Sequence, residues 1–254
     1  MLFALTHEIS PEINRCELSF IKREKIDFSL AAKQHEKYCN ILREEGLKVI
    51  EMSVNSEYPD STFVEDTAVV VDELAVMANM GAETRRGEIN GIESELKKYR
   101  DIFHIKHPAT LDGGDVLKVG RDIYVGITPR TNIPGAESLA DALKHLGYNI
   151  RHVKVTGCLH LKSACTAIDN QTLLVNPAWI DHKDFEGFKL INIDKSEPWA
   201  ANTLRINNTI YIHAGFIKTA ELLQKLGFSV KTIDISELLK AEAGLTCSSI
   251  IFLV

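Results

Sequence analysis

The stretch EDTAVVVDELAVMAN, residues 65–79, contains two short apolar runs on either side of the polar pair Asp72-Glu73. Short apolar runs that flank a turn predict a β-hairpin. An amphipathic segment follows at residues 89–99, with apolar residues at helical spacing, and a third apolar run follows at residues 102–107. The predicted order of elements is therefore strand, strand, helix, strand, or ββαβ.

This ββαβ unit recurs along the chain. Three further hairpins are predicted, at residues 115–127, 164–176 and 203–214. Each is followed by a predicted helix, although the helix of the third unit, at residues 179–185, is short and poorly patterned. A fifth unit begins with the predicted strand at 248–254, which is the last segment of the sequence. The N-terminal run 1–5 can supply its missing strand, and residues 32–54 can supply its helix and last strand.

The recurrence predicts how the units are arranged. No unit alone can bury both faces of its strands, so repeated units must pack against one another. Because the first and last strands would complete one unit, the termini would meet and the five units would close into a ring. We expect an α/β fold in which residues 1–254 form a single domain, since no linker rich in Pro, Gly or Ser interrupts the repeat.

The composition is that of an ordinary globular chain of 254 residues, with 45% hydrophobic and 25% charged residues. A net charge of −6 without a block of Lys and Arg argues against nucleic acid as a partner. The N-terminal apolar run is too short for a signal peptide, and no run approaches the ~20 apolar residues that cross a bilayer. We therefore expect a cytoplasmic protein without a membrane partner. Five cysteines without a CxxC pair indicate neither a disulfide framework nor a thiolate zinc site, and the oligomeric state is not encoded in any readable pattern.

One position of the repeat carries unusual residues. Just before the first strand of successive hairpins lie Asp66, Asp112, His160, Asn202 and Cys247, at spacings of 46, 48, 42 and 45 residues. If the units are related by rotation about one axis, equivalent positions converge at one end of that axis. Folding alone would favour apolar residues there, so we expect carboxylate, imidazole, amide and thiol groups to face one cavity.

These residue types indicate the chemistry. A Cys thiolate is a nucleophile, a His can donate a proton to a leaving amine, and an Asp can hold the imidazole in one tautomer. The sequence therefore predicts a catalytic triad of a Cys, a His and an Asp, with Cys247 and His160 as the thiol and the imidazole at this position of the repeat. Two further carboxylates, Asp60 and Asp66, would bind a planar guanidinium and present its central carbon to Cys247.

The motifs that contain these residues resemble those of the dimethylargininase (dimethylarginine dimethylaminohydrolase) family, within the guanidine-modifying or pentein superfamily. The matching motifs occur in order over most of the chain: PDSTFVED, GAETRR, LDGGDVL, VGITPRTN, GAESLADAL, LHLKS and LTCSS. The resemblance implies a five-bladed α/β propeller of ββαβ units with pseudo-fivefold symmetry. It also implies hydrolysis of asymmetric dimethylarginine or monomethylarginine to citrulline and dimethylamine or methylamine, through a covalent thiouronium intermediate and without a metal or organic cofactor.

The same resemblance implies that Cys247 is the nucleophile, His160 the general acid and base, and Asp112 the partner of His160. It also gives further residues roles around this guanidino amino acid. Glu65 and Phe63 would line the site, Arg85 and Arg130 would bind the α-carboxylate of the substrate, and Leu18 would lie on a mobile lid. An arginine side chain suits carboxylate binding because its donors form a planar fork.

The chain departs from the family pattern at a few points. Ser248 follows the nucleophile where some members have a second Cys, and Pro129 precedes Arg130 where a basic residue is common. Neither departure removes a catalytic group. The segment 176–196 is short and matches poorly, which leaves the outer shape of that part of the chain open.

Three alternatives remain at this point. The same chemistry could act on arginine or another guanidine, because selection of a methylated leaving group depends on the shape of the pocket. A non-catalytic propeller could serve as a binding module, as in ribosome anti-association factors, although the presence of Cys247, His160 and Asp112 together argues against it. A structural zinc on Cys247 and His160 would lack the usual four ligands.

Overall fold

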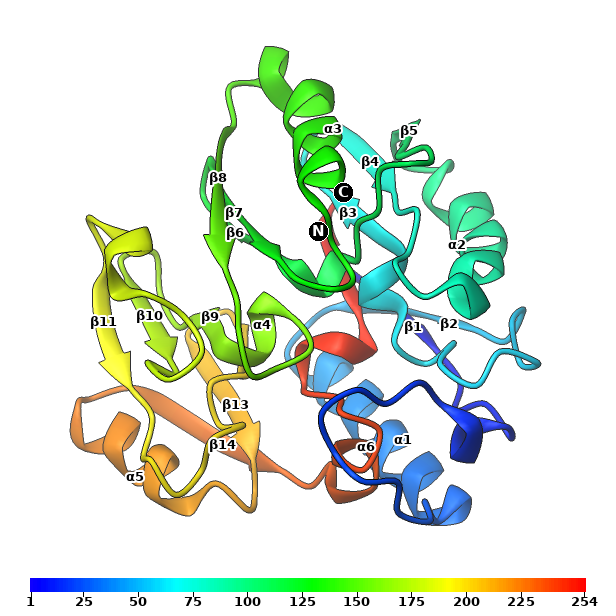
Figure 1. Ribbon diagram of the computed structural model, residues 1–254. Coiled ribbons are helices and arrows are strands. Elements are labelled where there is room, and N and C mark those ends of the chain that lie inside the picture. Colours follow the sequence, from blue (N-terminus) through cyan, green and yellow to red (C-terminus); the bar gives the residue numbers. More distant parts are fainter.

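The computed structural model describes residues 1–254 as five three-stranded sheets arranged around a common centre (Figure 1). In every unit the first two strands pair antiparallel, and the third strand pairs parallel to the second. A parallel pair needs a crossover connection, and each unit places its helix or helical turn there. The predicted α/β propeller of ββαβ units is therefore confirmed.

The strands group by unit in chain order. The five sets are β3 (Ala68–Val70), β4 (Leu74–Met77) and β5 (Asp101–His104); β6 (Val116–Val119), β7 (Asp122–Ile127) and β8 (Asn149–Lys154); β9 (Cys165–Ala167), β10 (Thr172–Val175) and β11 (Lys189–Asn192); β12 (Leu204–Ile206), β13 (Thr209–His213) and β14 (Ser229–Ile233); and β15 (Ile250–Leu253), β1 (Leu2–His7) and β2 (Lys48–Met52).

Most crossovers contain an α-helix. The crossover helices are α1 (Phe28–Glu44), α2 (Ile89–Leu96), α3 (Ile133–Leu143) and α5 (Ile217–Lys225), while the shorter α4 (Leu161–Ala164) and α6 (Ser236–Leu239) precede β9 and β15. The third unit has only a 3₁₀ turn, His182–Phe185, in agreement with its weak pattern. Helix α1 begins before the predicted Ala32, because the side chain of Asp27 accepts the N–H of Leu30 and caps it.

The first and last strands belong to one sheet. β1 pairs with β15, with Leu2 opposite Leu253, and its other edge pairs with β2. The amino group of Met1 donates a hydrogen bond to the carbonyl oxygen of Val254. Figure 1 shows both ends of the chain beside each other near the centre of the molecule. We propose, with this closure as support, that residues 1–254 form one catalytic domain.

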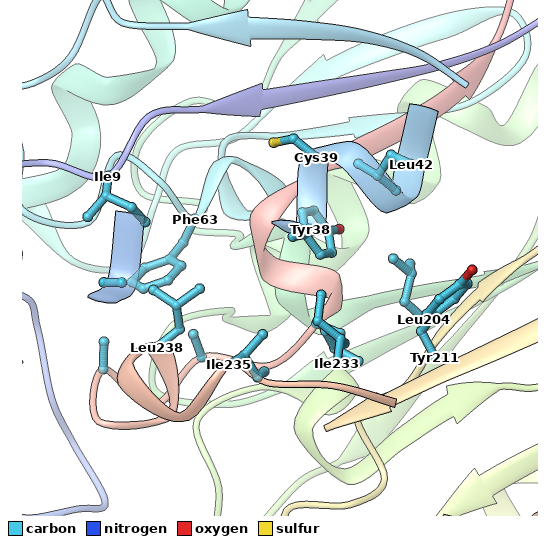
Figure 2. Packing of buried hydrophobic residues seen from close by; sticks show 14 of the residues in the cluster. Ile9, Tyr38, Cys39, Leu42, Phe63, Leu204, Tyr211, Ile233, Ile235 and Leu238 are labelled. Carbon is cyan, nitrogen blue, oxygen red and sulfur yellow. The ribbon is translucent and has the colours of Figure 1, made fainter. Parts of the chain in front are cut away.

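The largest apolar cluster joins the fifth unit to the fourth (Figure 2). Tyr38 and Leu42 on α1 pack with Leu204, Tyr211 and Ile233, which lie on the strands of the fourth unit. Other clusters fill the spaces between the remaining units in the same way. Helix α1, with seventeen residues, is the longest, and no helix combines the length and apolar character needed to span a bilayer. The expected cytoplasmic location stays a prediction.

The ring closure leads to a test of stability at two adjacent positions of β15. Phe252 is 5% exposed and its ring lies 5.8 Å from that of Phe3 and 5.4 Å from that of Tyr99, whereas Leu253 is 55% exposed. We expect Phe252→Ala to lower the free energy of unfolding by about 3 to 5 kcal/mol because it leaves a cavity between units. Leu253→Ala should change it by less than about 0.5 kcal/mol. Urea denaturation of both variants measures the difference, and equal losses would contradict this role of the closing strand.

Candidate active site

Short helical turns present the polar side chains at the start of each sheet. Asp66 lies on the 3₁₀ turn Val64–Thr67 before β3, and Asp112 immediately precedes the turn Gly113–Asp115 before β6. His160 is the residue before α4, which leads into β9. Cys247 lies on the turn Thr246–Ser248 before β15. The common phase of the repeat therefore corresponds to one structural position.

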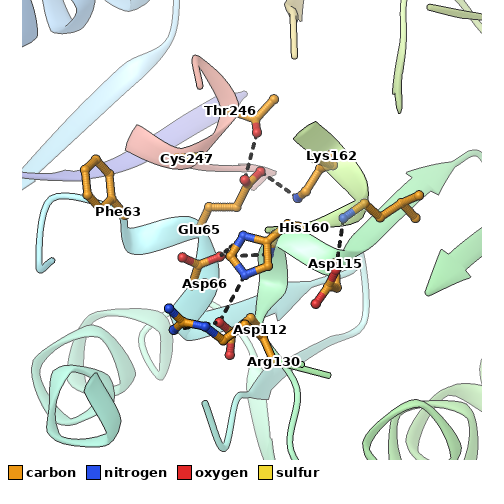
Figure 3. Close-up of polar contacts among 12 residues, drawn as sticks. Phe63, Glu65, Asp66, Asp112, Asp115, Arg130, His160, Lys162, Thr246 and Cys247 are labelled. Carbon is orange, nitrogen blue, oxygen red and sulfur yellow. Dashed lines mark hydrogen bonds and ion pairs between the residues drawn. The ribbon is translucent and has the colours of Figure 1, made fainter. Parts of the chain in front are cut away.

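His160 lies between two buried carboxylates from neighbouring units (Figure 3). Its Nε2 is 3.1 Å from Oδ2 of Asp112, and its Nδ1 is 3.7 Å from Oδ1 of Asp66. The backbone N–H of Gly81 donates to Oδ1 of Asp112 at 2.8 Å, and that of Gly114 donates to Oδ1 of Asp66 at 3.0 Å. These contacts hold the imidazole in one orientation.

The close approach also explains a glycine. A Cβ atom on Gly114 would lie 2.6 Å from Oδ1 of Asp66 and 2.6 Å from Nδ1 of His160. Gly114 does not have a positive φ angle, so its role is to make space for these side chains and not to allow an unusual turn. The LDGGD motif is thus a packing requirement of the site.

The ion pair between His160 and Asp66 shifts the pKa of both side chains. Burial opposes the charge on His160, but the carboxylates of Asp66, Asp115 and Asp112 outweigh it and raise the pKa of the imidazole to about 9. Burial would raise the pKa of Asp66, but His160 and Arg85 outweigh it and lower the value to about 2. At neutral pH the site therefore contains an imidazolium, which is a proton donor.

Cys247 has the opposite electrostatic environment. Burial, together with the charges of Glu65 and Asp66, raises the pKa of its thiol to about 12. The backbone N–H of Gly244 is 3.3 Å from Sγ and favours the thiolate, but it does not compensate for the carboxylates. The thiol is consequently protonated until a positive charge is brought close to it.

One small cavity brings most of the predicted residues together. The predicted residues that line it are Asp60, Phe63, Asp66, Arg85, Arg130, His160 and Cys247. Asp112 supports His160 from behind. The other residues of the wall are Glu17, Leu159, Ala241, Glu242 and Ala243, none of which sequence reasoning singled out.

Besides Asp112, three of the residues considered from the sequence lie outside this wall. Glu65 is bound by the ammonium of Lys162 at 2.6 Å and by the hydroxyl of Thr246 at 2.8 Å, and it lines a second cavity of about 870 Å³. Leu18 is half-buried and packs against the cluster of α1. Asn202 was expected to face the common cavity, but its side-chain amide bonds to Thr246 and to the carbonyl oxygen of Lys162. Asn202 therefore stabilises the turn that contains Cys247.

The two predicted carboxylate-binding arginines differ in their contacts. The guanidinium of Arg85 is bound by Glu88 at 2.9 Å and by Asp66 at 2.6 Å, and it also donates to the carbonyl oxygen of Phe63. In contrast, one terminal nitrogen of Arg130, Nη1, is buried without a hydrogen-bond partner, 3.8 Å from Asp112. An unpaired buried donor of this kind is available for a ligand.

Asp115 is a further residue of the site that sequence reasoning missed. It is fully buried and accepts the backbone N–H of Leu161 at 2.9 Å and the hydroxyl of Thr128 at 2.7 Å. Burial raises the pKa of Asp115 to about 6. Because it binds the first residue of α4, it positions His160, and the second acid of LDGGD was the signal that could have identified it.

One cluster has the residue types of a metal site. Candidate ligand atoms of Asp66, Asp112 and His160 lie within 4.8 Å of one another. However, each ring nitrogen of His160 already faces a carboxylate, and the raised pKa keeps a proton on both nitrogens. The ion pairs account for this cluster, and the expected independence from metal stays a prediction.

Comparisons with known proteins identify relatives over almost the whole chain. The family model described as N,N dimethylarginine dimethylhydrolase, eukaryotic, matches residues 3–209. The N(G),N(G)-dimethylarginine dimethylaminohydrolase of Pseudomonas aeruginosa is 31% identical, with 90% of this chain and 91% of the relative covered. The enzyme of the same name from Streptomyces coelicolor is 36% identical, with 97% and 95% covered.

Solved structures extend this likeness to the fold. A dimethylarginine dimethylaminohydrolase of Pseudomonas aeruginosa, a cysteine-to-serine variant complexed with citrulline, has a TM-score of 0.93 at 28% identity and covers 98% of both chains. A histidine-to-glycine variant, an adduct with S-methyl-L-thiocitrulline, has a TM-score of 0.94 at 28% identity and covers 99% of this chain and 100% of its own. A cyanobacterial arginine dihydrolase domain, 17% identical over 99% of this chain and 98% of its own, shares the fold with a TM-score of 0.84.

The raised pKa of His160 predicts a pH dependence of stability. The folded-state value of about 9 exceeds the unfolded value of about 6.5, so the ion pairs contribute fully below pH 6.5 and their contribution is lost as pH rises through 9. We expect the difference in unfolding free energy between the wild type and His160→Asn to shrink by on the order of 3 kcal/mol between pH 6.5 and 9.5. Denaturant titrations at both pH values measure it, and parallel profiles for the two proteins would contradict the assignment.

Proposed function

We propose that this chain, which belongs to the dimethylarginine dimethylaminohydrolase family, hydrolyses an Nω-methylated arginine to citrulline and methylamine or dimethylamine. The observation that carries the proposal is one cavity in which a thiol, an imidazolium and two carboxylates meet: Cys247, His160, Asp60 and Asp66. Such a site matches a substrate that is a planar cation with a reactive central carbon and an amine leaving group.

The carboxylates would bind the guanidinium end of the substrate. Oδ1 of Asp66 faces His160 and Gly114, and its other oxygen is held by Arg85, so the carboxylate is fixed in orientation before a ligand enters. Asp60 is 4% exposed and also lines the cavity. Preorganised acceptors of this kind hold the guanidinium plane, which is the positioning effect that favours attack on the central carbon.

The substrate would also activate the nucleophile. Burial, together with the nearby carboxylates of Glu65 and Asp66, raises the pKa of Cys247, and a bound guanidinium would place a positive charge close to the thiol. The cation therefore lowers the thiol pKa and favours loss of the thiol proton to solvent. In the free protein the thiol is kept protonated, which limits side reactions with oxidants and electrophiles.

The reaction would then proceed in two halves. The Cys247 thiolate attacks the guanidinium carbon and forms a C–S bond, while the imidazolium of His160 donates its proton to the methylated nitrogen. The C–N bond breaks, the amine leaves, and an S-alkylthiouronium remains on the cysteine. Neutral His160 next accepts a proton from water as the water oxygen attacks the same carbon. The C–S bond then breaks, the remaining hydroxyl proton passes to solvent, and neutral citrulline and the thiolate are released. Asp112 keeps the imidazole oriented in both halves.

The remaining assignments concern the amino-acid end and the walls of the site. Arg130, with its unpaired Nη1, is the better placed of the two arginines for the α-carboxylate, whereas Arg85 is engaged by protein groups. Phe63 supplies an apolar wall. Glu65 would act through the turn of the nucleophile, to which it bonds at Thr246. A cytoplasmic location and the absence of a cofactor complete the proposal.

A product assay tests this function. We expect citrulline together with dimethylamine or methylamine from the corresponding methylarginines, at a kcat/KM at least about tenfold above that for arginine, for which ammonia would be the second product. Cys247→Ser should retain no more than a few per cent of turnover, with substrate binding within about tenfold, because a hydroxyl is a far weaker nucleophile in a pocket of the same shape. Preferential release of ammonia from arginine would favour the deiminase alternative, and no product from any guanidine would favour the binding module.

Substitution of Arg130 and of Arg85 should have different effects on the affinity for ligands with and without an α-carboxylate. We expect Arg130→Ala to weaken a guanidino amino acid by about 1 to 3 kcal/mol while changing the binding of agmatine, which lacks the carboxylate, much less. Arg85→Ala, the matched variant, should weaken both ligands because it releases Asp66 from its partner. Isothermal titration on the Cys247→Ser background measures all four affinities. An equal loss of both ligands in Arg130→Ala would show that this arginine supports the fold and does not bind the carboxylate.

A further inference from the structure

An irregular segment covers one side of the proposed active site. The chain from Cys16 to Asp27 has no helix or strand and joins the 3₁₀ turn Ile13–Arg15 to α1. Glu17 of this segment is part of the cavity wall, and Phe20 is 43% exposed. The contacts that hold this segment against the site therefore bear on catalysis as well as on stability.

One carboxylate binds three consecutive residues in the middle of this segment. Glu242 accepts the backbone N–H of Ser19 at 2.9 Å and that of Ile21 at 2.7 Å, and it also accepts the N–H of Phe20. Glu242 is 8% exposed and lines the same cavity as Glu17. A carboxylate that receives three backbone N–H groups is a strong acceptor site, because hydrogen bonds to charged groups exceed those between neutral groups.

The backbone at Glu242 supports a specific role for its side chain. Its φ angle is +58°, in the left-handed region that disfavours residues other than glycine. The neighbours Ala241, Ala243 and Gly244 are small, so a glycine would suit this turn on backbone grounds. A glutamate in this strained backbone conformation indicates a side chain that performs a function.

We propose that Glu242 is a positioning residue that acts as a latch: it holds the segment Glu17–Ile21 closed over the active site, and its release opens the cavity for exchange of substrate and product. The inference rests on the proposed function for its meaning in catalysis. Glu242 lies five residues before Cys247, so closure of the segment also fixes the loop that leads to the nucleophile. The latch thereby couples access to the site with the position of the loop that leads to Cys247.

A second carboxylate links the latch to the ligand. Both oxygens of Asp60 lie within hydrogen-bond distance of the backbone N–H of Glu17, at 3.1 and 3.3 Å. Asp60 is also a proposed acceptor for the guanidinium, so ligand and segment meet on one side chain. Glu242 has no such shared role, and it is therefore the residue whose removal should open the segment without removing a guanidinium acceptor.

Proteolysis in the absence of substrate tests the latch directly. The longer irregular stretch Cys16–Asp27 contains the exposed trypsin sites Lys22, Arg23 and Lys25, which directly follow the latched residues. We expect Glu242→Gln to increase the rate of cleavage at these sites by roughly tenfold or more, because the amide loses the charge and one acceptor oxygen. Alkylation of Cys247 by iodoacetamide, read from the mass of the labelled peptide, should rise in parallel. The matched control is Glu197→Gln, which removes a carboxylate that accepts two backbone N–H groups in another unit, from Lys218 and Thr219.

A change on the segment itself makes the test independent of any loss of stability at Glu242. Phe20→Pro removes one of the N–H donors, and Phe20→Ala removes only the exposed ring and keeps the donor. We expect the rate of tryptic cleavage of Phe20→Pro to match that of Glu242→Gln, and that of Phe20→Ala to match the wild type. The double variant Phe20→Pro with Glu242→Gln should be cleaved no faster than the faster of the two single variants. Additive effects, or a Glu242→Gln cleavage rate no higher than that of Glu197→Gln, would overturn the latch.

Kinetics provide the link to catalysis. With a methylarginine as substrate, Glu242→Gln should raise KM by roughly tenfold while kcat changes by less than about threefold, since the groups that carry out the chemistry are intact. A fall in kcat of about a hundredfold at constant KM would instead place Glu242 among the groups that act in the transition state and would overturn the positioning role. The proteolysis and alkylation results do not depend on turnover, so they test the latch even if the proposed substrate is wrong.

Discussion

Buried carboxylates from two neighbouring units, Asp66 and Asp112, are neutralised by an imidazolium that a third unit supplies at His160. Removing such groups from water costs several kcal/mol per charge, and apolar residues of similar size would often be the more stable choice. The geometry of the units follows from this pairing, because each carboxylate must approach the same ring closely enough to compensate for burial. Gly114 shows the consequence in the backbone, where no side chain could be accommodated.

The same electrostatic arrangement is incomplete without a cation. Burial raises the pKa of Asp60, and carboxylates with burial raise that of the Cys247 thiol, so both groups resist ionisation in the free protein. A guanidinium supplies the missing charge to both at once. In the proposed mechanism, recognition of the ligand and activation of the Cys247 thiol are then one event, which would account for the acids around a residue that must become an anion.

Sequence patterns predicted the fold well where the information is local. Alternation, turns and a repeated order of elements identified the units, and the shared phase of the repeat brought Asp112, His160 and Cys247 to one place. Contacts between distant segments were not predictable in this way: Asn202 was expected in the cavity but binds the turn of the nucleophile, and Glu242 contacts a loop more than two hundred residues away. Such side chains acquire their role from neighbours that only the folded chain provides.

The pairing of β1 with β15 also bears on how the protein is made. β1 must wait for β15, which lies more than two hundred residues later in the sequence, so the fifth sheet cannot form until β15 has been synthesised. Cys247 lies just before β15, so its thiol can join Asp112 and His160 only when this late strand has paired with β1. Four units can assemble beforehand with their carboxylates and imidazole paired. The proposed catalytic groups are consequently brought together in one late step, and a chain that stops before Cys247 would contain the buried carboxylates and the imidazole without the thiol.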